Sequence, residues 1–272
     1  MAIAGVVEER VTLEVRDGVA TVMLNRADKR NALDNAMFVS LAAVGEHLKT
    51  ASGVRAVVLS GEGQSFCAGL DFSSFQVMAG GNGSVNAGAM ADGRITHLAQ
   101  QVCWVWQEVP VPVIAALHGH ALGGGLQISL GADVRVAHPQ TQLSVRELFW
   151  GLIPDMTGTL MLSRLVRPDV AKELVFTARI LPAEEGHRLG LVTELADDPL
   201  GRAKAIAEEI ASRSPDAVRA AKRLLNRLAV ADAAQQFAAE REEIHHLIGS
   251  PNQAEAVTSY FEKRPPRFVD PA

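Results

Sequence analysis

One stretch, residues 112–137, constrains the fold of this chain more than any other. It reads PVIAALHGHALGGGLQISLGADVRVA, in which the apolar run 113–117 is typical of a buried strand. The glycine triplet at 123–125 then opens a short apolar stretch of helical character that ends at Gly131. A glycine turn between a strand and a helix exposes backbone N–H groups, and the helix dipole favours negative charge beside them. The stretch therefore predicts a strand–turn–helix unit whose backbone donors meet a stable or a transient anion.

Composition narrows the classes of protein that this chain can represent. Its 272 residues, 48% of them hydrophobic, can form one large domain, or one domain with an appendage. A net charge of −5 argues against a general nucleic-acid surface, and no apolar run approaches the roughly 20 residues of a membrane span. We therefore expect a soluble protein whose partners include neither nucleic acid nor membrane.

The chain ends and the cysteines indicate a cytoplasmic location. The first residues, MAIAGVVEERV, lack the basic and long apolar regions of a signal peptide, and the final residues, FVDPA, carry no peroxisomal tripeptide. Cys67 and Cys103 lie far apart and match no metal-binding or redox spacing, which is typical of a reducing compartment.

Hydrophobic patterns predict both strands and helices along most of the chain. Alternation around Asp17-Gly18 predicts a hairpin, and apolar residues at helical spacing predict a helix over 35–49. Residues 73–92 are rich in Gly, Asn, Ser and Ala, show no period, and predict a mobile surface segment. Further strands are predicted at 55–59, 113–117 and 191–195, and residues 133–137 and 142–145 are predicted to form a strand pair. Further helices are predicted at 94–108, 159–166 and 169–176.

A shift in pattern marks a domain boundary. Strands and helices alternate over residues 1–198, whereas residues 199–262 are expected to form helices alone, before a basic and proline-rich tail. We therefore predict an α/β core over 1–198 and a C-terminal helical region over 199–272.

Several common catalytic and cofactor-binding motifs are absent from the sequence. It contains no G-x-S-x-G nucleophile elbow, no G-x-G-x-x-G loop and no Walker A loop. His118 and His120 flank Gly119 without a third ligand at zinc-like spacing, so we interpret them as turn residues and predict no metal site.

Two glycine-containing segments could place backbone N–H groups around one oxygen atom. One is the loop 66–71, FCAGLD, and the other is the start of the helix at 123–125. Each follows a predicted strand, so an N–H group from each could converge as an oxyanion hole if the two strands are neighbours. Two ordinary glycine turns are the alternative, and spacing alone favours that alternative.

Five segments of the sequence are similar to motifs of one enzyme family. NRADKRNAL is similar to N-R-P-x-x-x-N-A-L, SFCAGLD to F-x-A-G-x-D, and ALGGGLQISLGADVRVA to A-L-G-G-G-x-E-L-A-x-x-C-D-x-x-x-A. GLIPDMTGT is similar to G-L-x-P-x-x-G-T, and FEKRPPRF to the C-terminal F-x-E-K-R-x-P-x-F. By these motifs, which occur in the same order, the chain resembles the crotonase superfamily, or enoyl-CoA hydratase/isomerase family, over nearly its whole length.

This resemblance implies both an architecture and a ligand. The family fold is a spiral of strand–strand–helix turns followed by C-terminal helices that mediate trimerisation, so a homotrimer or a hexamer of two trimers is expected. The ligand is an acyl-CoA thioester, in which coenzyme A is part of the substrate and no further cofactor is needed. The family's oxyanion-hole donors correspond to the N–H groups of Ala68 and Gly124. Such donors stabilise an enolate oxygen more than a neutral carbonyl, and one donor contributes roughly 3–4 kcal/mol.

The resemblance also points to the acid–base residues. Hydratases of this family use two glutamates, of which one corresponds to Glu147 and the other falls at Gln127, which cannot exchange a proton. Asp155, eight residues after Glu147, matches the aspartate of a proton-shuttling pair in the family's dienoyl-CoA isomerases, whose third acidic residue also falls at Gln127. Alternatively, Glu147 is a solvated glutamate or a salt-bridge partner of Arg146 or Arg164, and Asp155 caps a helix.

The residues at these acidic positions indicate which reactions the site favours. Two carboxylates on opposite sides of an acyl chain suit proton transfer between carbons, so double-bond isomerisation of an enoyl- or dienoyl-CoA ranks above hydration. Hydration of a 2-enoyl-CoA in fatty-acid oxidation stays open, because Gln127 could bind water or substrate. A non-catalytic acyl-CoA binder is a third alternative, favoured by the missing glutamate at that position. Other enolate chemistry, such as thioester hydrolysis, is a fourth.

Further residues are candidates for binding the substrate. The basic pair at 29–30 suits the phosphates of coenzyme A, unless it is simply solvated ahead of a helix, and the family's tail positions often reach CoA across a subunit boundary. The substrate-binding candidates are Lys29, Arg30, Ala32, Gly69, Leu70, Asp71, Gly123, Gln127, Phe261 and Lys263. The acyl-pocket candidates are Phe75, Met78, Phe149 and Trp150, for which core packing is the default.

Overall fold

The main structural element is a six-stranded sheet. The computed structural model describes residues 10–79, 93–230 and 233–268. The strand order is β1-β2-β3-β4-β6-β9, antiparallel between β1 and β2 and parallel from β2 onward. The strands are β1 (Val11–Arg16), β2 (Val19–Leu24), β3 (Ala56–Gly61), β4 (Val113–Leu117), β6 (Val134–Ala137) and β9 (Glu194–Leu195). The predicted hairpin at Asp17-Gly18 and the mixed α/β class are confirmed.

A second, three-stranded sheet begins directly after β4. It contains β5 (His120–Leu122), β7 (Gln142–Ser144) and β8 (Leu181–Pro182). The chain passes between the sheets at Gly119, whose φ is +60° and where a Cβ atom would lie 2.0 Å from the carbonyl oxygen of Gln64, so that only glycine fits. The strand β5 was not predicted, because three residues after a glycine are too short to show a period. The predicted pairing of 133–137 with 142–145 is wrong, since β6 and β7 lie in different sheets.

The helices follow the predicted order closely. They are α1 (Asn35–Thr50), α2 (Phe72–Ala79), α3 (Leu98–Glu108), α4 (Gly124–Leu130), α5 (Gly158–Leu165), α6 (Pro168–Thr177), α7 (Ala183–Leu189), α8 (Pro199–Ala211), α9 (Pro215–Val230), α10 (Ala233–Leu247) and α11 (Pro251–Phe261). Two short 3-10 helices, η1 (Ala27–Lys29) and η3 (Glu147–Trp150), lie beside the site described below. The helix α1 starts where the Asp34 side chain accepts the N–H of Met37, and it buries the predicted apolar face.

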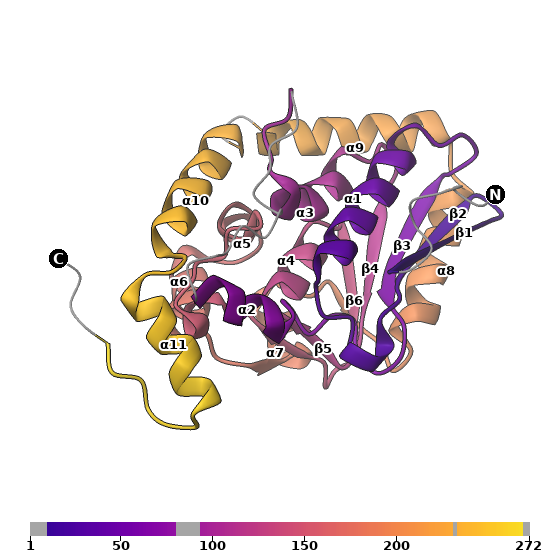
Figure 1. Cartoon of the computed structure of the whole chain (residues 1–272). Coiled ribbons are helices and arrows are strands. Elements are labelled where there is room, and N and C mark those ends of the chain that lie inside the picture. Colours follow the sequence, from indigo (N-terminus) through magenta and orange to yellow (C-terminus); the bar gives the residue numbers. More distant parts are fainter. Residues whose placement is uncertain (1–9, 80–92, 231–232, 269–272) are drawn as a thin grey trace.

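Helices cover both faces of the six-stranded sheet, with α1 and α3 on one side and α8 on the other (Figure 1). The strands β3 and β4 are therefore buried along their whole lengths. Ala203, Ala207 and Ala211 of α8 pack against the apolar face that includes Val58 and Ile114. By these contacts α8 belongs with the core, although it follows the boundary expected after residue 198.

Two predicted segments need correction. The third helix begins at Leu98 instead of residue 94, because His97 and Gln100 form a reciprocal capping box at that point. Residues 73–92 were expected to be a mobile surface segment without a period, but residues 73–79 lie in the helix α2, and residues 80–92 lie outside the described part of the chain. The helix α2 follows Asp71, whose carboxylate accepts hydrogen bonds from the N–H and the hydroxyl of Ser73.

The last three helices wrap around the core. The helix α9 crosses one end of the molecule, and α10 and α11 then descend along the side opposite β1, where α11 contacts α2 and α10 contacts α5 (Figure 1). Leu224 and Leu225 of α9 are 66% and 68% exposed, and Phe176 of α6 is 68% exposed. None of the described helices is both long enough and apolar enough to cross a membrane.

Candidate active site

The two glycine-containing segments singled out in the sequence lie side by side. The strands β3 and β4 that precede them are parallel neighbours. The loop 66–71 then runs along β5, where the N–H of Cys67 donates to His120 O at 2.9 Å and the N–H of Leu122 donates to Cys67 O at 3.1 Å. The condition for two converging backbone donors is therefore met.

The glycines at the start of α4 allow this close approach. A Cβ atom on Gly125 would lie 2.4 Å from Cys67 O, so no other residue lets α4 approach the loop so closely. Gly123 has φ +51° and ψ −123°, which side chains with a Cβ atom rarely adopt. A Cβ atom on Gly124 would meet Leu33 Cδ1 at 2.8 Å and Met156 Sδ at 2.9 Å. Backbone geometry, more than side-chain chemistry, therefore fixes this part of the site.

The loop presents a different N–H group from the one expected. The N–H of Ala68 donates to Arg30 O at 3.0 Å, so the prediction that Ala68 supplies a free donor is not supported. Gly69 O accepts the N–H of Leu33 at 2.8 Å, and the N–H of Asp71 donates to Leu33 O at 3.0 Å. Because successive amides of an extended segment point in opposite directions, the N–H of Leu70 points away from Leu33.

Leu70 and Gly124 supply the available pair of donors. In the part of the chain that the structure describes, no acceptor lies against the N–H of either residue. Both residues line one cavity of about 1260 Å³. The sequence could not distinguish Leu70 from Ala68 as the free donor. Which N–H groups of the loop stay free depends on its pairing with Leu33, which lies far from the loop in the sequence.

Most of the candidate residues share this cavity. Its wall includes Lys29, Arg30, Ala32, Ala68, Gly69, Leu70, Asp71, Gly123, Gly124, Glu147 and Asp155, together with the acyl-pocket candidates Phe75, Met78, Phe149 and Trp150. Gln127, Phe261 and Lys263 are not part of the wall.

Glu147 is a buried carboxyl group with one unsatisfied oxygen. It opens η3, and only 8% of its surface is exposed, which excludes a solvated glutamate. Its Oε1 accepts a hydrogen bond from Gln127 Nε2 at 2.6 Å, whereas its buried Oε2 has no partner among the described residues. Burial raises the pKa of Glu147 to about 8, and the charge of Asp155 adds to this rise while the hydrogen bond from Gln127 opposes it. Arg146, the expected alternative partner, donates to Ala178 O instead.

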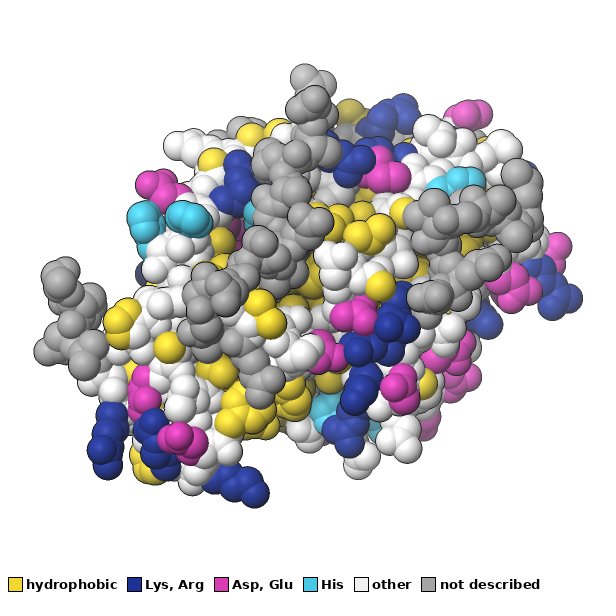
Figure 2. Space-filling model, in the orientation of Figure 1, with side chains coloured by type: hydrophobic (Ala, Val, Ile, Leu, Met, Phe, Trp, Pro, Cys, Tyr) yellow, Lys and Arg dark blue, Asp and Glu magenta, His cyan; other side chains and the backbone are white. Residues whose placement is uncertain are grey.

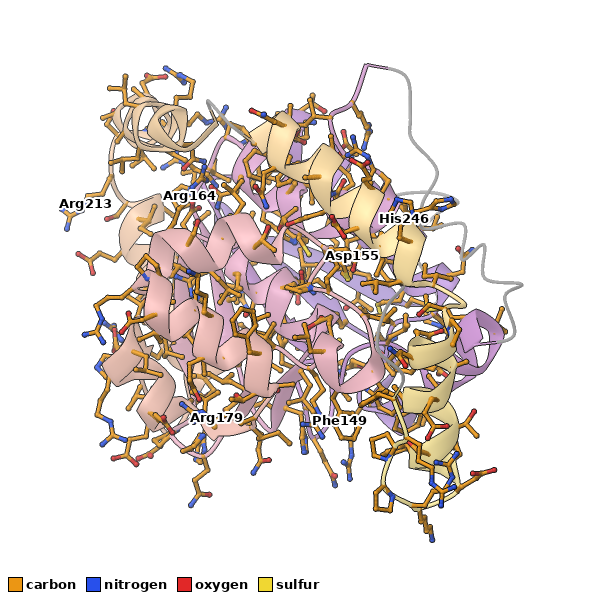
Figure 3. All side chains as sticks on the ribbon, turned by 90° about the vertical axis from the view of Figure 1, so that its left-hand side faces the viewer. Phe149, Asp155, Arg164, Arg179, Arg213 and His246 are labelled. Carbon is orange, nitrogen blue, oxygen red and sulfur yellow. The ribbon has the colours of Figure 1, made fainter. Side chains whose placement is uncertain are left out.

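Asp155 is, beside Glu147, the other carboxyl group of the cavity wall with a raised pKa. Burial, together with the charge of Glu240, raises the pKa of Asp155 to about 7. The alternative role as a helix cap is wrong, because α5 is preceded by Thr157 as its cap residue, with no side-chain cap bond. Figure 3 shows Asp155 in the interior between α10 and the core, whereas Arg179 and Arg213 lie at the periphery.

Glu240 is a buried acid that was missed in the sequence. Its carboxylate accepts hydrogen bonds from the N–H of Thr157 at 3.1 Å, from Thr159 Oγ1 at 2.5 Å and from Gln100 Nε2 at 3.1 Å. It therefore attaches α10 to the segment that carries Asp155. Glu240 lies three residues after the buried Phe237, on the apolar face of α10. An acidic residue at helical spacing among apolar residues could therefore have indicated in the sequence that Glu240 is buried.

Basic side chains and a fixed loop form one rim of the cavity. Lys29 and Arg30 are exposed beside it, and a group of Lys and Arg side chains borders the apolar hollow of this face in Figure 2. Asp71 forms an ion pair with Arg26 at 2.6 Å, so its carboxylate secures the loop 66–71. The exposed cations suit an anionic group such as a phosphate.

Apolar side chains from α2, η3, α10 and α11 form another part of the wall. Phe75 stacks on Trp150 with ring centroids 4.2 Å apart, in a cluster that also contains Met78 and Ile244. Tyr260 of α11 lines the cavity, whereas its neighbour Phe261 does not, although both side chains are 41% exposed. Within one subunit, the contribution of α11 to the cavity therefore comes from Tyr260.

Among residues 10–79, 93–230 and 233–268, no group of three or more His, Cys, Asp or Glu side chains could hold a metal ion.

Comparison with known proteins identifies the family. The family model for enoyl-CoA hydratase/isomerase matches residues 14–271. The chain is 34% identical over 257 residues to a short-chain-enoyl-CoA hydratase of Clostridium acetobutylicum, covering 93% of this chain and 95% of that protein. It is 30% identical to a crotonyl-CoA hydratase of Syntrophomonas wolfei, covering 96% and 98% of the two chains.

Solved structures agree with this assignment. The crystal structure of an enoyl-CoA hydratase/isomerase from Pseudoalteromonas atlantica superposes with a TM-score of 0.84 at 28% identity, covering 96% of this chain and 100% of that one. The expected crotonase-type fold, with its C-terminal helices, is thereby confirmed. The chain is an enzyme that belongs to the enoyl-CoA hydratase/isomerase family.

Proposed function

We propose that this enzyme moves a double bond within the acyl group of an enoyl- or dienoyl-CoA thioester. The observation that carries the proposal is the pair of carboxyl groups, Glu147 and Asp155, whose pKa values are raised to about 8 and about 7 and which line one cavity. Groups that titrate near neutral pH can both accept and return a proton.

In this proposal the thioester oxygen accepts hydrogen bonds from the N–H groups of Leu70 and Gly124. One carboxylate removes a proton from the carbon chain, and the resulting enolate places negative charge on the thioester oxygen, where the two donors stabilise it. A carboxylic acid then returns a proton to a different carbon. Coenzyme A enters as part of the substrate, with its phosphates near Lys29 and Arg30.

Hydration of a 2-enoyl-CoA is the second candidate. It is favoured by the names of relatives, which include a short-chain-enoyl-CoA hydratase and a crotonyl-CoA hydratase. It is disfavoured by Gln127, which occupies a hydratase acid position and whose amide oxygen already accepts hydrogen bonds from the N–H groups of Met156 and Gly158. A non-catalytic acyl-CoA binder is disfavoured because burying two carboxyl groups without ion-pair partners costs stability and is typical of active sites.

Two absorbance assays distinguish these candidates. With a 3,5-dienoyl-CoA, isomerisation creates a conjugated 2,4-dienoyl-CoA and ultraviolet absorbance rises. With a 2-enoyl-CoA, hydration removes conjugation and absorbance falls. We expect the first signal to dominate and Glu147→Gln to lower its rate 10²–10⁴-fold, the usual contribution of a general acid or base. Full turnover by that variant, or faster hydration than isomerisation by the parent, would contradict the proposal.

We also propose a cytoplasmic homotrimer, or a hexamer of two trimers, with residues 199–272 contributing to the contacts. The exposed Leu224, Leu225 and Phe176 support this assembly, because large apolar side chains of this kind are commonly buried between subunits. Light scattering coupled to size-exclusion chromatography measures the state directly. A monomer at micromolar concentration would contradict it, and Leu224→Glu is expected to weaken the assembly.

A further inference from the structure

Gln127 connects two parts of the active site through a single amide group. Its Oε1 accepts the N–H groups of Met156 and Gly158, each at 3.0 Å, at the start of α5. Its Nε2 donates to Glu147 Oε1 at 2.6 Å. Gln127 is only 1% exposed and is absent from the cavity wall. It therefore contacts the proton-transferring residue without facing the acyl group.

The orientation of this amide follows from its neighbours. An amide rotated by 180° would place its NH₂ group against two backbone N–H donors, which cannot accept hydrogen bonds. The oxygen must therefore face α5, and the NH₂ group must face Glu147. The fit is tight, since a Cβ atom on Gly158 would lie 2.4 Å from Gln127 Oε1. A glycine at 158 is thus required for the amide to reach α5.

This orientation makes the two oxygens of Glu147 unequal. Oε1 is held by the amide of Gln127, whereas Oε2 is buried and has no partner among the described residues. A Cβ atom on Gly123 would lie 3.2 Å from Oε1, so the held oxygen lies close to the glycine turn. A proton can therefore join or leave Glu147 only at Oε2 while the bond to Gln127 persists.

We infer that Gln127 is a positioning residue, which holds Oε1 of Glu147 so that Oε2 alone exchanges protons and Glu147 titrates as a single acid. The inference rests on the proposed function, in which Glu147 transfers a proton to or from the acyl group. It also explains why an amide occupies a position where hydratases of the family carry an acid.

A glutamate at position 127 would reverse this arrangement. Its carboxylate could still accept the N–H groups of Met156 and Gly158, so the contact with α5 would survive. Its other oxygen would face Glu147 Oε1 at about 2.6 Å, where two negative charges cannot coexist and the pair must share a proton. The pKa of Glu147 would rise as a result. Gln127→Glu thus separates the electrostatic role of the amide from its structural one.

The decisive experiment titrates Glu147 in the parent enzyme and in Gln127→Glu without substrate. Carboxyl ¹³C NMR of protein labelled at glutamate reports the titration, with the resonance assigned by its loss in Glu147→Gln. We expect the midpoint of Glu147 to move to higher pH by about one unit or more, and the matching limb of the pH profile of kcat/KM to move with it. An unchanged midpoint would overturn the inference.

A second variant distinguishes a loss of stability from a change in the titration of Glu147. Gln127→Met has a similar volume but offers neither acceptor nor donor, so it should lower the thermal midpoint and also raise the pKa of Glu147. Gln127→Glu should keep a thermal midpoint near that of the parent. If Gln127→Met lowers the thermal midpoint while leaving the Glu147 titration unchanged, Gln127 is only structural and the inference is wrong. Retained turnover in Glu147→Gln would instead refute the proposed function, independently of the titration.

Discussion

Two walls enclose the cavity, and they are built differently. The backbone wall consists of the loop 66–71 and the start of α4, and it presents main-chain N–H groups. The side-chain wall consists of Phe75, Met78, Ile244 and Tyr260 from α2, α10 and α11, and it presents apolar surface. The first is fixed by backbone hydrogen bonds of the loop to β5 and Leu33, and by glycines at which an added Cβ atom would clash. The second is fixed by packing between helices, which tolerates changes of shape better.

Because the two walls differ in this way, we expect them to control different properties of the reaction. In the proposed reaction, backbone donors bind the thioester oxygen, which all acyl-CoA substrates share, so the backbone wall would determine whether reaction occurs. Apolar side chains would contact the acyl group, which varies among substrates, so the side-chain wall would determine which substrate reacts. Four substitutions test this division, ordered from the largest expected effect to the smallest.

Among substitutions in the two walls, Gly125→Ala should have the largest effect. Its Cβ atom would lie 2.4 Å from Cys67 O, so α4 must shift away from the loop and separate the N–H groups of Leu70 and Gly124. Loss of one such donor commonly lowers kcat about 10²–10³-fold, and the decrease should be similar for all acyl chains. Steady-state kinetics on a panel of acyl-CoAs checks this, and a loss confined to long chains would contradict the division.

Met78→Ala should alter the choice of substrate instead. Met78 is buried in the side-chain wall, and removing most of its side chain opens space for a bulkier acyl group. We expect kcat/KM for short chains to fall less than about ten-fold, with the preference moving toward longer or branched chains. The same panel measures this preference. A uniform loss on every substrate would show that the two walls are not independent.

Between the walls, Glu147 should make stability depend on pH. Its pKa is raised from 4.5 to about 8 in the folded protein, so above pH 4.5 the unfolded chain releases this proton while the folded protein retains it. The free energy of unfolding therefore falls as pH rises from 4.5 toward 8. Glu147→Gln removes this penalty and should raise the thermal midpoint at about pH 8 but hardly at about pH 5. Equal midpoint differences at both pH values would contradict the raised pKa.

Lys29→Ala should have the smallest effect. Lys29 lies exposed on the rim, outside both walls, where a charge contact contributes little and is screened by salt. We expect KM to rise about two- to five-fold at low ionic strength and kcat to stay unchanged. An acyl-pantetheine substrate, which lacks the nucleotide phosphates, is the matched control and should react equally well with the parent and the variant.

The sequence predicted the backbone wall better than the side-chain wall. Glycine is required where a Cβ atom would clash, so the triplet at 123–125 and the loop 66–71 were visible as motifs. Even there, Leu70 was not recognised as the donor, because the direction of its N–H depends on pairing with Leu33 across the loop. Glu147 was found from its motif, but its burial and its bond to Gln127 depend on three-dimensional packing.

The side-chain wall was predicted in part, because Phe75 and Met78 were acyl-pocket candidates and line the cavity, whereas Ile244 and Tyr260 were not candidates. An apolar residue such as Ile244 resembles an ordinary core residue, and nothing local in the sequence indicates that it faces a cavity. The helix α2 was hidden by a polar, glycine-rich context, and Tyr260, which lines the cavity, was not among the candidates. Glu240 was missed because its partner Thr157 lies 83 residues earlier in the chain.

That long-range contact also determines when the site is completed during synthesis. Ribosomes release the chain from its N-terminus, so the sheet, the glycine turn and Glu147 emerge while α10 is still unmade. Until Glu240 arrives, the N–H of Thr157 and the side chain of Gln100 lack this acceptor, and the segment bearing Asp155 is held by Gln127 and by core packing of Met156, without its contact to α10. A nascent chain therefore has the N–H groups of Leu70 and Gly124 in place before the segment with Asp155 gains its contact with α10.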